Sequence, residues 1–181
     1  MKMAATAATF LAFAAAGCAS RGPSAPPEPI EPPMQTAEAD IKDSQGRSVA
    51  MASLTTAGDS LRVRIDATGL SSGAYGTHLH AVGRCQPPSF ESAGPHWNPT
   101  SRQHGRDNPQ GQHLGDLPNL LVGTDGRGTL EFTIPGASLD GGAAALLDGD
   151  GTSIVIHGRA DDYRTDPSGN SGARIACGIF G

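Results

Sequence analysis

The amino-acid sequence predicts an all-β protein, an antiparallel Greek-key sandwich or flattened barrel of about eight short strands with two long functional loops. The first observation is a regular alternation of apolar and polar residues, as in 61–66 (Leu-Arg-Val-Arg-Ile-Asp) and 130–134 (Leu-Glu-Phe-Thr-Ile). A strand that buries one face has this period of two residues. The second is the spacing of turn residues between such segments, and the third is that no convincing helical stretch follows residue 16. Together they favour two packed sheets or a closed barrel.

Eight segments have the strand pattern, and turn residues separate them. Ala57-Gly58-Asp59 separates the second strand from the third, and Asp125-Gly126 has the composition of a hairpin turn between the fifth and the sixth. The sequence Asp148-Gly149-Asp150-Gly151 superficially resembles a calcium loop, but it lacks the other ligand positions and is predicted to be a plain turn. The predicted strands are 37–43, 47–56, 61–66, 75–82, 119–124, 127–134, 152–158 and 173–180.

Two long connections, 83–118 and 159–172, interrupt this pattern. Long loops without regular structure in a compact domain are usually functional or disordered. The first of them holds three of the six histidines of the chain, so the sequence favours a functional loop.

Residues 1–18 are predicted to be an export signal. Lys2 gives a positive start, residues 4–16 are uncharged and mostly apolar, and the run is too short to span a bilayer as a helix. Ala15-Ala16-Gly17-Cys18 resembles a bacterial lipobox in which Cys18 is lipidated. Because Ala15 stands where leucine is usual, cleavage without a lipid is the alternative. We expect an exported, periplasmic protein that is anchored to a membrane through Cys18.

Residues 19–36 are predicted to be a proline-rich linker, and residues 37–181 the folded domain. Such a density of proline favours an extended, semi-rigid spacer. The net charge is −5, and only two lysines occur. Without a basic stripe, no nucleic-acid partner is expected, and membrane contact is expected only through the lipid anchor. The sequence does not predict an oligomeric state.

Cysteine usage agrees with export. If Cys18 carries the lipid, Cys85 and Cys177 remain and can pair in an oxidising compartment. Their bridge would close a loop of about 93 residues and contribute roughly 4 to 5 kcal/mol by restricting the unfolded chain. The alternative is two unpaired buried thiols.

The six histidines are the most informative residues for function. His96, His104 and His113 in the first long loop form, with Asp116, a complete tetrahedral set for zinc without a vacant position, which is typical of a structural site. The remaining three are His78, His80 and His157.

The remaining histidines lie on predicted strands. His78 and His80 are two residues apart, so both rings point to one face of a strand. His157, which follows Ile154-Val155-Ile156, would by itself be read as a core histidine. Three imidazoles suit copper if a fourth nitrogen is available, and an imidazolate that binds one metal through each ring nitrogen could supply it.

Taken together, these segments resemble the copper/zinc superoxide dismutase family. The match follows the family's order over nearly all of residues 37–181 and is highly specific. The segments that carry it are 76–80 (Gly-Thr-His-Leu-His), 92–99, 104–105, 113–119, 157–162 and 172–178.

The resemblance implies a copper ion and a zinc ion that share the ring of His96. It also implies that Cys85 and Cys177 form the family's disulfide, that Asp161 links His78 to His104, and that Arg174 lies over the copper and attracts the substrate anion, superoxide. Copper would take up and return an electron while His96 takes up and delivers a proton, yielding dioxygen and hydrogen peroxide. The implied ligands are His78, His80, His96 and His157 for copper, and His96, His104, His113 and Asp116 for zinc.

The sequence departs from the family in two places. Trp97 stands where phenylalanine is commoner, and we expect it to pack beside the bridging ligand. The second long loop lacks the lysine that helps to steer substrate in many members; Arg164 could substitute for it or lie on the loop surface.

Three other functions compete with the dismutase. The main alternative is an exported copper and zinc buffer that binds metal without turnover, although storage needs neither Arg174 nor Asp161. A zinc hydrolase would need an open coordination position and a general base. An adhesion sandwich would leave the histidine pattern unexplained.

Overall fold

The structure is a computed structural model that describes residues 34–181. The expected export signal, Cys18 and residues 19–33 of the expected linker lie outside the described residues, so these expectations stay predictions. Within 34–181, no helix has the length and apolar character needed to cross a membrane. The elements are β1 (Thr36–Asp43), β2 (Ser48–Ala57), β3 (Ser60–Ala67), β4 (Gly73–Tyr75), β5 (Thr77–His80), the short 3-10 helix η1 (Glu91–Ala93), β6 (Leu120–Val122), β7 (Gly128–Pro135), β8 (Ser153–His157) and β9 (Arg174–Ile179).

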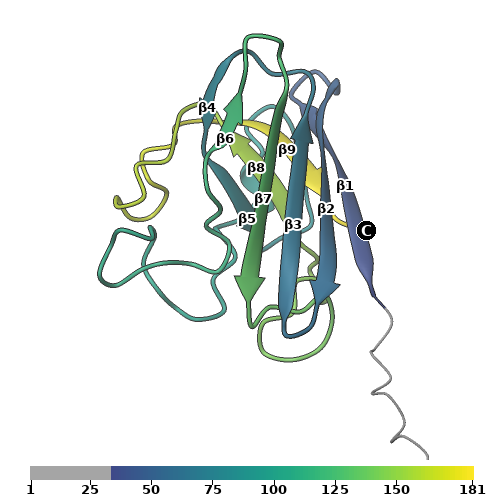
Figure 1. Cartoon of the computed structure of the whole chain (residues 1–181), viewed down its shortest axis with the longest axis vertical. Helices are drawn as coiled ribbons and strands as arrows, with labels where there is room; N and C mark the ends of the chain where they lie inside the picture. The colour runs from purple at the N-terminus through teal and green to yellow at the C-terminus, as the bar shows by residue number, and fades with distance from the viewer. Residues whose placement is uncertain (1–33) are drawn as a thin grey trace, which may run out of the picture. The chain divides into compact units, whose positions relative to one another are not determined.

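The strands form one large antiparallel sheet and one small one. The large sheet has the order β5-β8-β9-β1-β2-β3-β7, and β4 pairs with β6 in the small sheet. Figure 1 shows β1, β2, β3 and β7 on one side and β5, β8 and β9 behind them, so the large sheet curls into two layers. Because β7 pairs with β3 across three intervening strands, the chain crosses over as in a Greek key.

The core lies between the two layers and follows the predicted alternation. On β3, Leu61, Val63 and Ile65 are fully buried, while Arg62 and Arg64 point to solvent. Each fully buried alkyl side chain contributes about 1.5–3 kcal/mol relative to an exposed one. The same core cluster includes apolar residues of β8, so it holds the front and back layers together.

The predicted strand 75–82 is wrong as a single element, because the chain forms β4 and β5 with Gly76 between them. The three residues of β4 pair with β6 in the small sheet, whereas β5 pairs with β8 in the large one. A Cβ on Gly76 would lie 2.8 Å from the Cβ of Ser171, so glycine permits this close approach. The change of partner therefore divides the strand.

The expected hairpin at Asp125-Gly126 is also corrected. The turn forms, with the N–H of Gly123 donating to the carbonyl of Arg127 at 2.8 Å, but β6 and β7 pair with different strands. Strand β7 takes the full length of β3 as its partner, over eight residue pairs. A third long connection, 136–152, was not predicted; it buries Leu139 and Leu146 in the core.

The first long connection runs back along the free edge of β5. The N–H of Trp97 donates to Leu79 O at 2.8 Å, and the N–H of Leu79 donates to Gly115 O at 2.9 Å. A Cβ on Gly115 would lie 2.6 Å from Leu79 O, so only glycine allows the backbones to approach this closely. This contact brings the loop histidines beside those of the strand.

Candidate metal centre

Strands β5 and β8 supply three of the buried imidazoles. His78 and His80 lie two residues apart on β5, and His157 ends the neighbouring β8. His78 and His80 are wholly inaccessible to solvent, and His157 is buried. His157 belongs to this cluster and is not an isolated core histidine, because the centroid of its ring lies 4.7 Å from that of His78.

The first long loop adds His96 and Asp116 to these rings. Backbone bridges pair His80 with His96 and His78 with Asp116, so the loop is in register with β5. The ring of His96 stacks on that of His78 at a centroid distance of 4.0 Å. His96 therefore lies at the centre of the histidine cluster.

A first group of four ligand atoms comes from His78, His80, His96 and His157, all within 4.8 Å of one another. Hydrogen bonds set the tautomers of three of these rings. His78 Nε2 donates to Asp161 Oδ2 at 2.7 Å, His80 Nδ1 donates to Gly94 O at 2.9 Å, and His157 Nδ1 donates to Gly172 O at 3.2 Å. The other ring nitrogens, His78 Nδ1, His80 Nε2 and His157 Nε2, are buried without a hydrogen-bond partner.

Buried, unpartnered lone pairs normally cost about 1–3 kcal/mol each. Here they converge, and their opposite ring nitrogens are each held by an oxygen, as is usual for histidines that bind metals. The first group therefore fits a cation that prefers nitrogen ligands.

A second group gathers around the carboxylate of Asp116. Its Oδ1 lies 2.9 Å from His96 Nδ1, 3.0 Å from His104 Nδ1 and 3.0 Å from His113 Nδ1. Ligands about 2.0 Å from a tetrahedral zinc ion lie about 3.3 Å apart, so these separations are close to those of an occupied site. His104 Nδ1 forms no hydrogen bond despite its distance to the carboxylate, which is the arrangement of two lone pairs that face a shared cation.

His78 also adjoins the second group. Its ligand atom lies within 4.8 Å of those of His96, His104 and Asp116, whereas His113 joins the group through Asp116. Because His78 Nε2 is engaged by Asp161, its unpartnered Nδ1 belongs with the first group. The two groups are thus adjacent and share His96.

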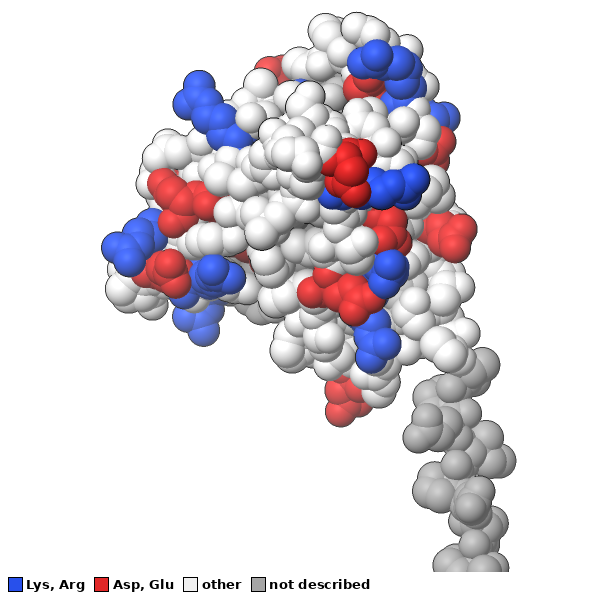
Figure 2. Space-filling view, turned by 45° about the horizontal axis from the view of Figure 1, so that its top comes forward, with Lys and Arg blue, Asp and Glu red and all other residues white. Residues whose placement is uncertain are grey.

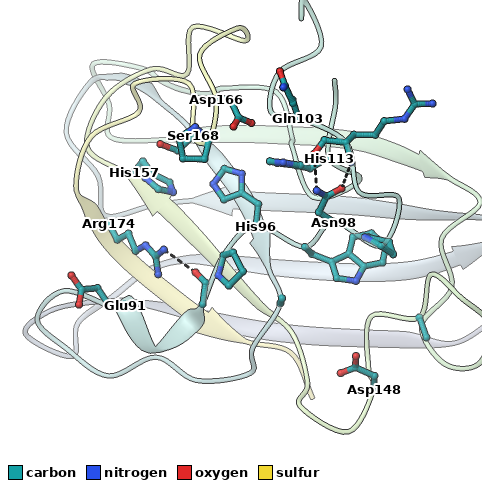
Figure 3. A pocket seen from close by; sticks show the side chains of 18 of the residues that line it. Glu91, His96, Asn98, Gln103, His113, Asp148, His157, Asp166, Ser168 and Arg174 are labelled. Atoms are coloured by element: carbon teal, nitrogen blue, oxygen red, sulfur yellow. Dashed lines mark hydrogen bonds between the residues drawn. The ribbon is translucent and has the colours of Figure 1, made fainter. Parts of the chain in front are cut away.

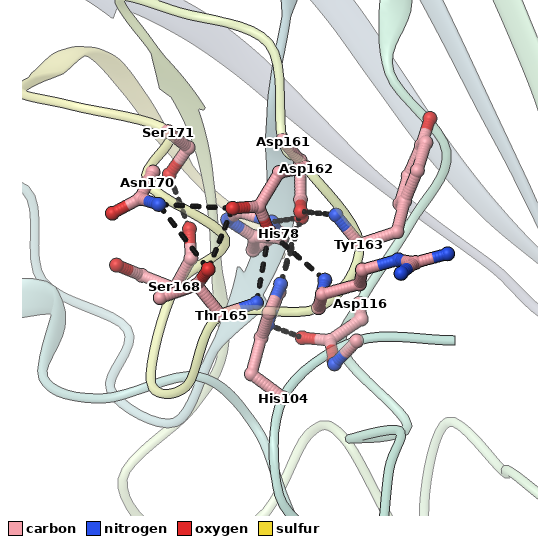
Figure 4. A network of polar contacts seen from close by, with 12 residues as sticks. His78, His104, Asp116, Asp161, Asp162, Tyr163, Thr165, Ser168, Asn170 and Ser171 are labelled. Atoms are coloured by element: carbon pink, nitrogen blue, oxygen red, sulfur yellow. Dashed lines mark hydrogen bonds and ion pairs between the residues drawn. The ribbon is translucent and has the colours of Figure 1, made fainter. Parts of the chain in front are cut away.

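Asp161 connects the two groups from behind (Figure 4). It accepts from His78 Nε2 at 2.7 Å through Oδ2 and from His104 Nε2 at 3.1 Å through Oδ1. Asn119 fixes the backbone of Asp161: its Oδ1 accepts from Asp161 N at 2.7 Å and its Nδ2 donates to Asp161 O at 3.0 Å. Sequence reasoning assigned no role to Asn119, because a contact across 42 residues leaves no local pattern.

Gly169 packs against the same carboxylate. A Cβ at this position would lie 1.8 Å from Asp161 Oδ1 and 2.7 Å from His104 Nε2, and the φ angle of +61° also favours glycine. The second long loop can therefore cover Asp161 only where a side chain is absent.

The electrostatics keep the first group in its ligand form. Burial lowers the pKa of His78 to about 3 and that of His157 to about 4, and it lowers the pKa of His80 well below the usual value. These imidazoles are neutral at pH 7, as metal binding requires. Burial would by itself raise the pKa of Asp161, but hydrogen bonds from His104 and His78 outweigh it and hold the carboxyl well below its usual range.

Arg174 lies beside the first group in an open pocket of about 960 Å³ that His96 and His157 also line (Figure 3). Its two terminal nitrogens donate to Phe90 O and Gly94 O, each at 2.8 Å. The structure therefore places a half-buried positive charge in the wall of this pocket. Trp97 lines the same pocket and is buried in the core cluster, as expected for a residue beside His96.

Cys85 and Cys177 form the expected disulfide, with a Cα–Cα distance of 5.6 Å. The bridge ties the start of the first long loop to β9, the strand that carries Arg174. Phe90 and Ala93 pack against Cys177 in a small apolar cluster of their own. This anchor fixes the loop segment whose carbonyls hold the guanidinium.

The fold and the site define a class: antiparallel β-sandwich proteins with two adjoining metal sites on one shared histidine. The family model for copper/zinc superoxide dismutase (SODC) matches residues 48–180. The chain belongs to this family. Copper and zinc are therefore its cofactors, and the two clusters are the groups that could hold them.

Individual relatives agree with the family. The chain is 41% identical over 178 residues to the superoxide dismutase-like protein YojM of Bacillus subtilis, covering 93% of this chain and 91% of YojM. It is 38% identical over 143 residues to the Cu-Zn superoxide dismutase 1 of Aquifex aeolicus, covering 78% of this chain and 85% of that protein. The crystal structure of a superoxide dismutase-like protein from Bacillus subtilis matches with a TM-score of 0.75 and 41% identity, over 78% of this chain and 96% of that one.

Proposed function

We propose that the protein is a superoxide dismutase, which converts two superoxide anions and two protons into dioxygen and hydrogen peroxide. The observation that carries this proposal is the shared ring of His96 between two groups of ligand atoms, with the guanidinium of Arg174 in the same pocket. A storage site needs neither the shared ring nor the cation.

The proposed ligands follow the two groups. Copper would be held by His78, His80, His96 and His157, and zinc by His96, His104, His113 and Asp116. The unpartnered nitrogens of His78, His80 and His157 support the first assignment, and the convergence of three Nδ1 atoms on Asp116 supports the second. When bound, copper supplies one-electron redox chemistry and zinc supplies Lewis-acid support.

The residues of the chain perform the remaining tasks. Arg174 attracts the anion and orients it, because its guanidinium is half-buried and fixed by two carbonyls. His96 can hold a proton on Nε2 and release it to the product, since its Nδ1 stays beside Asp116. Asp161 keeps the rings of His78 and His104 in fixed orientations, so the site does not reorganise between the two half-reactions.

The test is the rate of superoxide decay after pulse radiolysis, with purified protein loaded with both metals. We expect a second-order rate constant that approaches the diffusional limit of about 10⁸–10⁹ M⁻¹s⁻¹. His96→Ala should lower it by at least about a hundredfold, because the shared ligand and the proton carrier are lost together. Far-UV circular dichroism checks that the variant keeps its sheets. An alanine variant with unchanged turnover contradicts the proposal.

A non-catalytic copper and zinc buffer is the second candidate, and one observation favours it: the Bacillus subtilis relative is named only as superoxide dismutase-like. Metal analysis alongside the decay measurement separates the two. Full loading with both metals and no accelerated decay would establish the buffer.

We further propose that the protein works outside the cytoplasm, in the periplasm, tethered through lipidated Cys18. The Cys85–Cys177 disulfide supports export, since such bridges persist in oxidising compartments. Mass spectrometry of the membrane fraction would test the anchor, and Cys18→Ser should release the protein if the lipid is present.

A further inference from the structure

The pocket over the first histidine group is poorly suited to an anion in one respect. Besides two arginines, Arg102 and Arg174, three carboxylates line it: Glu91, Asp148 and Asp166. Acidic side chains therefore outnumber basic ones by one, and the whole chain carries a net charge of −5. On the face drawn in Figure 2, basic and acidic residues are interspersed rather than gathered into one field. Attraction of an anion must then come from individual, well-placed cations.

Arg102 is one of these cations, and its backbone is held in place. Its N–H donates to Asn98 Oδ1 at 3.0 Å, and Asn98 Nδ2 donates to its carbonyl at 2.8 Å. Asn98 lies two residues after His96 and lines the pocket in Figure 3. The two hydrogen bonds therefore fix Arg102 in the pocket wall relative to the shared ligand.

The charge of Arg102 is free for a ligand. Its side chain is exposed, and within residues 34–181 its guanidinium forms neither an ion pair nor a hydrogen bond. By contrast, the guanidinium of Arg64 pairs with Asp66 and Glu131, and that of Arg106 stacks on the ring of Tyr163.

Arg164 does not take this place. It lies on the second long loop and is exposed, but it is not among the residues that line the pocket. Between the two interpretations of Arg164 that the sequence left open, its location favours the loop surface. The exposed cation of the pocket wall therefore comes from the first long loop.

We propose that Arg102 is a steering residue that attracts the small substrate anion into the pocket, which Arg174 also lines. The inference rests on the proposed dismutase function, and it places the steering charge in the loop that carries the metal ligands. Arg174 then orients the anion, and Arg102 sets how often it arrives.

The first experiment measures superoxide decay at ionic strengths of about 0.01 M and about 0.3 M, between which the screening length falls severalfold. Arg102→Gln should lower the rate constant about two- to fivefold at the lower ionic strength, and the difference should shrink at the higher one. Arg102→Lys should restore most of the rate. The matched control is Arg164→Gln, which removes one exposed arginine outside the pocket and should lower the rate clearly less than Arg102→Gln does. Arg102→Gln without effect at low salt, or with an effect independent of salt, overturns the proposal.

Removal of a negative charge from the same pocket gives a second test. Glu91→Gln should raise the rate constant at low ionic strength, by up to about twofold, since it removes a repulsive charge from the wall. A lower rate in this variant at equal metal content would contradict an electrostatic role for the pocket wall.

Azide binding separates this inference from the proposed function. Protein loaded with both metals is titrated with azide, a small monovalent anion, and binding is followed by the visible absorption of copper. Arg102→Gln should weaken azide binding about twofold at low salt, with metal content unchanged. Weaker azide binding without any dismutation in the parent protein supports Arg102 and refutes the proposed function. Rapid dismutation with both measurements unchanged in Arg102→Gln refutes Arg102 alone.

Discussion

The front layer of the sandwich and the two long loops differ in the kinds of side chain that they bury. In β1, β2 and β3 the fully buried side chains are alkyl groups, such as Ile41, Leu54 and Ile65. Around the loops 81–119 and 158–173 the buried side chains also include imidazoles and carboxylates, such as His104 and Asp161. The front layer packs through apolar contacts, whereas the metal centre, which the loops form together with β5 and β8, contains four buried ring nitrogens without partners.

This difference shows where the fold depends on bound ions. Apolar burial needs only neighbouring side chains, and β1, β2, β3 and β7 pair side by side in the large sheet. At the metal centre, each unpartnered nitrogen costs about 1–3 kcal/mol until a cation replaces the missing contact. The two regions should therefore respond differently to the same perturbation.

Metal removal should separate the two regions most strongly. Each cation present at about a thousandfold excess over its Kd stabilises the fold by about 4 kcal/mol, which chelation would remove. Hydrogen exchange should then show lost protection in 81–119 and 158–173, with β2 and β3 still protected. Equal loss of protection in β3 would mean that the sheet depends on the metals as much as the loops do.

Removal of the disulfide should have the next largest effect. The bridge spans 92 residues, so Cys85→Ser with Cys177→Ser should lower the free energy of unfolding by about 4–5 kcal/mol. Urea unfolding of the metal-loaded protein measures this. The bridge joins a loop to β9, and Cys177 of β9 pairs with Lys42 of β1 in the front layer. The loss should therefore affect both regions, and an effect confined to the loops would be unexpected.

Gly169→Ala should disturb the metal centre without weakening the front layer. The added methyl group would displace Asp161 from His104, and loss of such support typically lowers metal affinity about 10- to 100-fold. Competition with a chromogenic zinc chelator measures the affinity. The control is Gly149→Ala, since a Cβ there meets nothing within 4 Å. Identical affinities in the two variants would show that the Asp161 contact has no influence on zinc.

Acidification of the metal-free protein should have the smallest effect, measured as the change in the free energy of unfolding per pH unit. Burial lowers the pKa of His78 to about 3 and that of His157 to about 4, whereas histidines of an unfolded chain titrate near about 6.5. Below that pH the unfolded chain binds more protons, so stability is lost as the pH falls towards 4. The slope is about 1.4 kcal/mol per pH unit for each such imidazole.

His104 has the opposite dependence. Burial alone would lower its pKa, but Asp116 and Asp161 outweigh burial and raise it to about 9, so its contribution is complete below about pH 6.5 and is lost as the pH rises through 9. Urea midpoints of the chelated protein should therefore be highest at about pH 6.5–7, because stability falls both below and above this range. A midpoint that does not change from neutral pH to about pH 4.5 would exclude the assigned burial of His78 and His157.

The sequence predicted most of the front layer, because alternation is a local property. Residues 61–66 alternate without a fault, and β3 has the corresponding buried and exposed faces. The division at Gly76 could not be predicted, since it depends on Ser171, almost a hundred residues later. The connection 136–152 was missed because its buried leucines are spaced irregularly and their partners lie on distant strands.

The sequence predicted the residues of the candidate site better than the loop contacts that support them. Histidine is rare in this chain, and each of the six falls within the two neighbouring groups around His96 and Asp116. The supporting contacts of Asn119 and Gly169 leave no comparable trace. An asparagine clamp and a glycine contact depend on backbone approach in three dimensions, which spacing along the chain does not encode.

The hydrogen bonds between the first long loop and β5 also protect the molecule from its own copies. β5 is the terminal strand of the large sheet, and the loop occupies its outer edge through Trp97 and Gly115. An uncovered edge of this kind recruits strands from other molecules and seeds aggregates. We therefore expect the protein to aggregate more readily without its metals, because a loosened loop would leave the edge of β5 open.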